Sequence, residues 1–329
     1  MDPRSRPICS DCEAPVDRRT FIRTVGSAAL VGAAGPALLG GRFAQAAPTT
    51  KSAAETAVGR FYGSLSEAQK SAIVLPFDHE LRQKINANWH ITKPTLDDDF
   101  YSNEQRALVH EILRSVTTED GYARILRQTE DDSGGIGGYS MAVFGTPGAG
   151  KFEWEITGRH LTLRADGDSV DKAAFGGPII YGHGAEQPKD NLFHYQTKKA
   201  NEVFHALDAK QAAKALLTAA PKEAEVALQG DKGAFPGIAI GELSADQKQL
   251  VESTLKIILA PYRKEDVDEV FEILKTGGGV EKLHMAFYQE GDLQDDKVWD
   301  IWRVEGPSFV WHFRGAPHVH AYINIGVKT

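Results

Sequence analysis

Three segments of the chain begin with a serine followed by an apolar stripe at helical spacing. Ser66, Ser102 and Ser244 are each preceded by an apolar residue and followed, three positions later, by a glutamine. The serine oxygen can accept a hydrogen bond from the third backbone N–H of a helix while the glutamine reaches back, which is the capping-box arrangement. Apolar residues then recur three or four positions apart, as on the buried face of a helix. The pattern predicts a helix after each serine.

Short runs of alternating or apolar residues, typical of β-strands, follow these helices. They cover residues 139–144 and 154–158, and similar runs occur at 283–288 and 302–306. Matching helix starts and strands occur in the same order in both regions, at offsets that grow from 142 to 148 residues. The repeat indicates an internal duplication, with chance similarity of amphipathic elements as the alternative.

Helices followed by strands, twice, predict an α+β fold. Strands that are close together in the sequence favour antiparallel sheets in each half. We expect a first half at residues 47–229 and a second at 230–329, packed as one globular unit. Between them, residues 206–228 are rich in alanine and predict a helix that breaks at Pro221, and residues 230–241 are a glycine-containing linker.

The segment from Gly145 to Lys151 has the spacing of a phosphate-binding loop but lacks its chemistry. The residue after the lysine must carry a hydroxyl that holds Mg²⁺, and here it is Phe152. Such a loop also opens into a helix, whereas residues 152–156 alternate like a strand. The segment is therefore interpreted as the turn of a hairpin.

The first 46 residues have the features of an export signal. Arg18 and Arg19 precede a short, weakly apolar run at residues 25–39, and small residues lead to a cleavage site after Ala46. The paired arginines resemble a twin-arginine signal. The apolar run is shorter than the roughly 20 residues that span a membrane, so an anchor is the weaker alternative. We expect the twin-arginine export machinery as a partner, a periplasmic or extracellular location, and no membrane span in the mature chain.

Composition narrows the class of protein. The 329 residues carry a net charge of −8 with 42% hydrophobic residues, which fits a globular chain and argues against nucleic acid as a partner. Both cysteines, Cys9 and Cys12, lie in the predicted signal, so the mature chain would have neither a disulfide nor a thiol nucleophile.

The histidines supply the chemical signal. His318 and His320 are two residues apart in a predicted strand, so both imidazoles point to the same face and can ligate one divalent ion. His160 is the first candidate for a third ligand, because it follows the corresponding strand of the first half; His183 and His312 are the next candidates. Neutral imidazoles suit zinc, copper, iron and nickel. The alternative is a set of surface or hydrogen-bonded histidines.

Several segments together resemble one family of exported bacterial proteins, catalogued as domain of unknown function 3500. The resemblance spans residues 64–323 and rests on SNEQ at 102–105, FGTP at 144–147, WEITGRHLTL at 154–163, GPIIYG at 177–182, RVEGPS at 303–308 and PHVH at 317–320. Members of the family typically have two histidines where this chain has Arg159 and His160, and often a longer charged tail. The family implies no established activity, but it supports the convergence of His160, His318 and His320.

These observations lead to two hypotheses. In the first, a transition metal, zinc or copper, held by the three histidines makes the protein a hydrolase or an oxidoreductase acting on a small molecule. Arg159, or Arg303 with Glu305, would then orient an anionic substrate, and Glu155 or Glu305 is a candidate acid or base. In the second, the protein is a non-catalytic periplasmic protein that binds a ligand or a metal.

Overall fold

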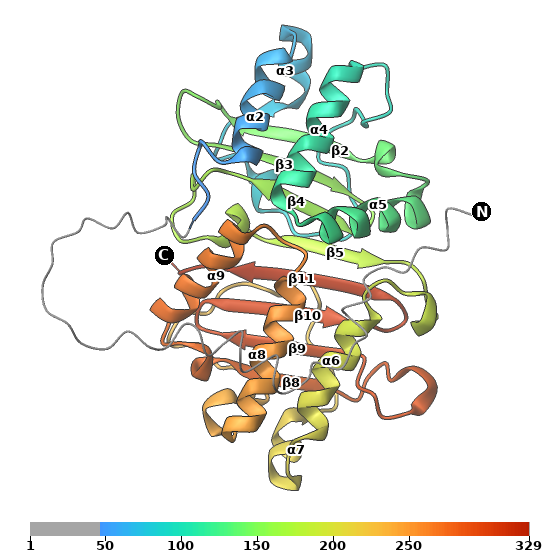
Figure 1. The fold of residues 1–329 in the computed structure, drawn as a ribbon, viewed down its shortest axis with the longest axis vertical. Helices are drawn as coiled ribbons and strands as arrows, with labels where there is room; N and C mark the ends of the chain where they lie inside the picture. The colour runs from blue at the N-terminus through green and yellow to red at the C-terminus, as the bar shows by residue number, and fades with distance from the viewer. Residues whose placement is uncertain (1–46, 329) are drawn as a thin grey trace, which may run out of the picture. The chain divides into compact units, whose positions relative to one another are not determined.

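The computed structural model describes residues 47–328, which form one large mixed sheet with helices over one of its faces (Figure 1). The predicted signal at residues 1–46 lies outside the described residues. Within residues 47–328, no helix combines the length and the apolar character that crossing a bilayer requires. The α+β class predicted from the sequence is confirmed.

Eight α-helices occur in the described part of the chain, and their apolar stripes face the sheet. They are α2 (Ala53–Ser64), α3 (Glu67–Ile73), α4 (Asn103–Val116), α5 (Glu119–Ser133), α6 (His194–His205), α7 (Ala209–Ala215), α8 (Ala245–Leu259) and α9 (Lys264–Thr276).

Eleven strands form the sheet, in the order β1-β2-β3-β4-β5-β11-β10-β9-β8-β6, with β7 pairing with β8. All pairs are antiparallel except β1–β2 and β6–β8. The strands are β1 (Val74–Leu75), β2 (Ser140–Gly145), β3 (Phe152–Gly158), β4 (Leu161–Ala165), β5 (Ile179–His183), β6 (Leu216–Leu217), β7 (Ile238–Ala239), β8 (His284–Tyr288), β9 (Ile301–Gly306), β10 (Phe309–Arg314) and β11 (Val319–Ile325).

The order of the elements repeats along the chain. Two helices, a short parallel strand, two more helices and four antiparallel strands occur from α2 to β5. The same series occurs from α6 to β11, with the two-residue strand β7 added before α8. The two series meet where β5 pairs with β11 in the middle of the sheet. The second series begins at α6, ahead of the boundary expected between residues 229 and 230, and that boundary stays a prediction.

The capping boxes predicted at Ser66, Ser102 and Ser244 are confirmed, each with both reciprocal hydrogen bonds. The capping glutamines also join neighbouring helices. Gln69 and Gln105 exchange amide hydrogen bonds between α3 and α4, and Gln211 and Gln247 do the same between α7 and α8. One side chain therefore closes a helix start and fixes the next helix beside it, at equivalent places in the two series.

The two faces of the sheet differ in chemistry. The face under the helices is apolar and includes Trp154, Trp302 and Trp311 in the main core. The opposite face carries buried charges, such as Arg164 in an ion pair with Glu155 (3.1 Å). Residues 76–99 and 218–237 cover this second face as extended loops with few regular elements.

Of two predictions about the segments that connect the regular elements, one is confirmed and one is wrong. The segment from Gly145 to Lys151 joins antiparallel strands β2 and β3, so the hairpin interpretation is confirmed. The predicted helix over residues 206–228 is wrong, because only α7 is helical there and Leu216 and Leu217 form β6 instead. Pairing of these leucines with Phe287 and Tyr288 in β8 prevails over the helix propensity of alanine.

Candidate metal centre

The three histidines singled out in the sequence lie together at the middle of the sheet. His160 is in the turn between β3 and β4, His318 immediately precedes β11, and His320 is its second residue. The ring centroids are 5.1 Å apart for His160 and His318, 4.6 Å for His160 and His320, and 4.8 Å for His318 and His320. One nitrogen from each ring can be chosen so that all three lie within 4.8 Å of one another.

The pairing of the strands brings these rings together. β5 is hydrogen-bonded to β4 on one side and to β11 on the other, and Gly182 of β5 is the register partner of His320. A Cβ at Gly182 would be 3.2 Å from the Cβ of His160 and would overlap the carbonyl oxygen of Val319. The glycine therefore lets the turn and β11 approach from opposite sides of β5.

The backbone of the turn is held in place from several directions. His160 has a left-handed conformation with φ 58°, which is uncommon for a residue with a side chain. Its N–H donates to the carbonyl of Ala87 at 2.6 Å, and the Tyr139 hydroxyl donates to the carbonyl of Arg159 at 2.6 Å. Gln128 also donates to this carbonyl. These contacts offset the local strain and fix the direction of the imidazole.

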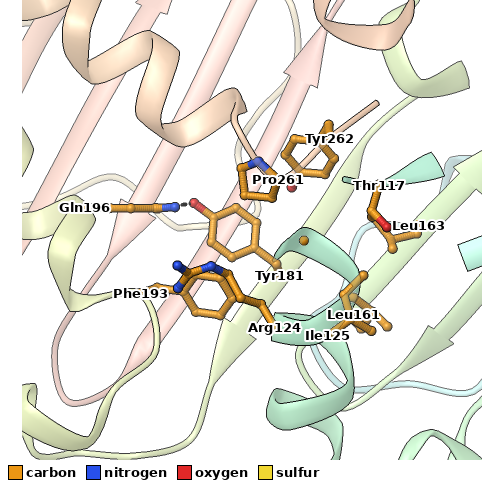
Figure 2. A pocket seen from close by; sticks show the side chains of 11 residues that line it. Thr117, Arg124, Ile125, Leu161, Leu163, Tyr181, Phe193, Gln196, Pro261 and Tyr262 are labelled. Atoms are coloured by element: carbon orange, nitrogen blue, oxygen red, sulfur yellow. Dashed lines mark hydrogen bonds between the residues drawn. The ribbon is translucent and has the colours of Figure 1, made fainter. Parts of the chain in front are cut away.

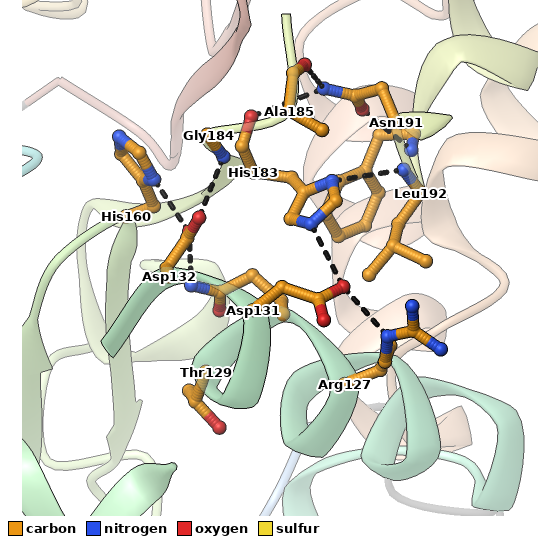
Figure 3. Close-up of polar contacts among 12 residues, drawn as sticks. Arg127, Thr129, Asp131, Asp132, His160, His183, Gly184, Ala185, Asn191 and Leu192 are labelled. Carbon is orange, nitrogen blue, oxygen red and sulfur yellow. Dashed lines mark hydrogen bonds and ion pairs between the residues drawn. The ribbon is translucent and has the colours of Figure 1, made fainter. Parts of the chain in front are cut away.

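A carboxylate of α5 orients His160 (Figure 3). Oδ2 of Asp132 lies 2.7 Å from Nδ1 of His160, and Asp132 also accepts from Gln128 and from the N–H of Gly184 at 2.8 Å. Burial raises the pKa of Asp132, but these hydrogen bonds outweigh it and leave the pKa below its ordinary value. The ionised carboxylate assigns the proton to Nδ1 and leaves Nε2 of His160 available as a ligand.

Glu223 lies in the loop that covers the face of the sheet away from the helices, and it orients His320 as Asp132 orients His160. Both carboxylate oxygens lie 3.2 Å from Nδ1 of His320, and Oε2 is 3.2 Å from Nε of Arg314. Burial raises the pKa of Glu223, and the hydrogen bond and charge of His320 lower it further than burial raises it. Carboxylate–histidine pairs of this kind orient the ligands of metal sites.

His318 completes the group. Its Nε2 is 3.1 Å from Nε2 of His320. Burial, then the charges of His320 and Arg314, lower the pKa of His318 to about 4, so its ring is neutral at pH 7. Without a metal this contact is a hydrogen bond between two imidazoles. Ligands of a tetrahedral zinc ion lie about 3.3 Å apart, so His318 and His320 already have a separation suited to binding one ion.

His183 and His312, the other candidates for the third ligand, are not part of this group. Nε2 of His183 is 3.3 Å from Asp131, and its Nδ1 accepts from the N–H of Leu192 at 3.2 Å, so both nitrogens are engaged (Figure 3). His312 is buried in β10, where it pairs with Arg303 of β9 on one side and with Tyr322 of β11 on the other. Burial and the charge of Arg303 lower the pKa of His312 to about 3.

Arg303 and Glu305 lie in a separate groove of about 890 Å³ on the loop-covered face. They form an ion pair at 3.1 Å, and Glu305 also accepts from Gln229. Glu155 is paired with Arg164. None of these residues is among the groups that contact the three histidines.

Two hollows lie nearer to the first series of elements. One, of about 30 Å³, is lined by Tyr181, Phe193 and Tyr262 among others and has room for little more than a water molecule (Figure 2). The other, of about 270 Å³, is lined by Asp132, Arg159 and Gly184 among others, and so adjoins the histidine group.

The comparison with protein families identifies the family to which the chain belongs. Residues 47–323 match the family described as "Protein of unknown function (DUF3500)". The chain belongs to DUF3500. No curated protein and no solved structure matches it. Membership of DUF3500 confirms the family resemblance found in the sequence and assigns no activity, so function has to be argued from the site.

Sequence reasoning missed the two carboxylates that orient the ligands. Asp132 lies in the last turn of α5, and Glu223 lies in the segment wrongly expected to be helical. A weak signal existed for Asp132, because an acidic residue is unfavourable near the carbonyl end of a helix and is usually placed there for another reason. No signal in the sequence points to Glu223.

Proposed function

We propose that this DUF3500 protein binds one divalent transition metal through His160, His318 and His320. The observation that carries the proposal is the pair of carboxylates, Asp132 and Glu223, that hold the Nδ1 atoms of two of these rings. Two histidines merely packed together would not need an ionised partner behind each ring. The arrangement leaves the Nε2 atoms of both rings for a metal, as in zinc proteins.

The donor set favours a catalytic centre over a closed structural one. Among residues 47–328, His160, His318 and His320 form the only group of three or more potential metal donors, and no fourth donor joins it. Structural zinc sites are closed by four protein ligands, whereas catalytic sites have three and bind water at the fourth position. Zinc lowers the pKa of that water to about 7 and so produces a nucleophile. The activity that fits best is metal-dependent hydrolysis of a small molecule.

We also propose that the protein is exported by the twin-arginine route and acts outside the cytoplasm. Support comes from the paired arginines, the short apolar run and the small residues before residue 47. The family match begins at residue 47, where the mature chain would begin. N-terminal sequencing of the exported protein should give Ala47 as the first residue, and replacement of Arg18 and Arg19 by lysine should retain the precursor in the cytoplasm.

Metal analysis of the natively exported protein tests the central proposal. About one equivalent of zinc or copper is expected, and the His318→Ala/His320→Ala double variant should lose it. His205→Ala removes an exposed histidine at the end of α6 and serves as the matched control, which should retain the metal. Full retention in the double variant would exclude these histidines as ligands. One bound metal without hydrolytic activity on any small ester, amide or phosphate would instead support the non-catalytic binding protein.

A further inference from the structure

A hollow of about 270 Å³ lies beside the histidine group, and no step of the proposed function has used it. Its lining consists of Asp131, Asp132, Arg159, His183, Gly184 and Ala185. Asp132 also holds His160, and Arg159 is the residue before His160. Two of the six residues that line the hollow are therefore direct neighbours of His160, the first proposed ligand.

Gly184 separates the hollow from the imidazole of His160. A Cβ at Gly184 would be 3.5 Å from Cε1 of His160, 3.3 Å from Nη2 of Arg159 and 2.7 Å from Oδ1 of Asp132. Because the glycine has no side chain, only its backbone stands between the hollow and Cε1 of His160, while Arg159 lines the hollow itself. A small molecule in this space is within reach of both.

Each charged side chain around the site has a hydrogen-bond or ion-pair partner among residues 47–328, with one exception. Asp131 is matched by Arg127 and His183, Asp132 accepts from His160 and two further donors, and Glu223 is matched by Arg314. The guanidinium of Arg159 is exposed and has no hydrogen bond or ion pair with any residue in 47–328.

A bound metal would add to this positive charge. Imidazole ligands contribute no negative charge, and of the two orienting carboxylates Glu223 is already paired with Arg314. Asp132 alone would offset no more than one of the two charges of a divalent ion. A ligand that carries negative charge is attracted both by the ion and by Arg159.

We infer that the metal centre takes a small substrate with an oxyanion group, a carboxylate or a phosphate, and that Arg159 binds this group in the hollow beside His160. The inference rests on the proposed metal centre. Arginine suits the role because its planar donors match the two oxygens of a carboxylate or a phosphate. Arg159 positions the anion. A metal ion held by the three histidines would supply a hydroxide for hydrolysis, in which the water oxygen bonds to the carbonyl carbon or the phosphorus and the ester or amide bond breaks, the leaving group taking up a proton.

The test uses the exported, full-length mature protein loaded with Co²⁺, whose visible absorption reports changes at the metal. Metal content is measured first. Sodium acetate and sodium phosphate are then titrated separately, at constant ionic strength, into the wild type, Arg159→Gln and Arg60→Gln. Arg60→Gln is the matched control, because Arg60 is an exposed arginine of α2, paired with Glu111, that does not line the hollow.

We expect at least one anion to change the spectrum of the wild type, and Arg159→Gln to weaken its binding about tenfold while retaining the metal, as for the loss of a charge-assisted hydrogen bond. Arg60→Gln should bind like the wild type. Preference for acetate or for phosphate shows which of the two oxyanion groups the site binds. Metal binding with equal anion affinity in Arg159→Gln overturns this inference alone. Absence of metal from the wild type overturns the proposed metal centre.

Discussion

Nδ1 of His160 lies 2.7 Å from Oδ2 of Asp132, so a carboxylate of helix α5 determines which nitrogen of this histidine faces the other two. Replacement of Asp132 by Asn removes the charge that fixes the tautomer. We expect metal affinity to fall about 10- to 100-fold, as for other residues that orient metal ligands. Competition with a chelating dye measures it. Asp131→Asn is the neighbouring control and should change affinity less than threefold, because Asp131 contacts His183 instead.

Glu223 should have an equivalent effect on His320. Glu223→Gln loses the ionised partner of Nδ1, and we expect a loss of metal affinity on the order of tenfold. Glu225→Gln is a matched control from the same loop, because its side chain is exposed and its contact with Arg303 uses the backbone carbonyl. Equal effects of the two substitutions in the same dye assay would show that the loop, and not the carboxylate, matters.

Gly182→Ala should disrupt the fold around the site. The added Cβ would overlap the carbonyl oxygen of Val319 and press against His160, and overpacking of this kind costs about 1–3 kcal/mol. A urea titration of the metal-free protein should show a lower midpoint. Gly59→Ala is the control, because nothing lies within 4 Å of its Cβ in α2, and there alanine should stabilise by roughly 0.5–1 kcal/mol. A Gly182→Ala protein as stable as the wild type would contradict the described packing of β5 against the turn.

The stability of the fold should decline towards alkaline pH because of Glu269. Burial, followed by repulsion from Asp266 and Asp166, raises the pKa of Glu269 to about 9, against 4.5 for an unperturbed glutamate. The folded state keeps the proton while the unfolded state releases it, so the free energy of unfolding falls as pH rises from about 4.5 to 9.

Glu269→Gln removes the contribution of this carboxyl to the pH dependence. Urea unfolding at pH 5 and pH 9 should show a smaller difference in midpoint for the variant than for the wild type. Glu272→Gln, on the exposed side of the same helix, should behave like the wild type. An equal difference in midpoint for Glu269→Gln and the wild type would show that Glu269 is ionised in the folded protein.

The sequence predicts the local elements and part of the site. Ser102 and Ser244 mark helix starts because a capping box depends on residues that are three positions apart. His318 and His320 are adjacent in space for a similar local reason. The reason for choosing His160 is wrong, although the residue does lie beside the pair. Its turn follows β3, the equivalent of β9, whereas His318 and His320 begin β11, the equivalent of β5, and the pairing of β5 with β11 brings them together.

Features that depend on distant pairing escaped prediction. Leu216 and Leu217 leave the helical pattern because β8 is available as a partner. Glu223 reaches His320 only because residues 218–237 fold back over a face of the sheet, and this path has no periodic signature. Asp132 contacts His160 beside the end of β5, where it also accepts from the N–H of Gly184. Its role therefore depends on the order of the strands in the sheet.

The pairing of β5 with β11 has a consequence for the molecule as a whole. His160 and Asp132 come from one side of this seam, and His318, His320 and Glu223 from the other. An ion bound among them would link the two series, in addition to the pairing of β5 with β11 and the buried ion pair of Glu55 with Arg263. Chelation would then loosen the centre of the protein first, while the outer edges of the sheet keep their structure.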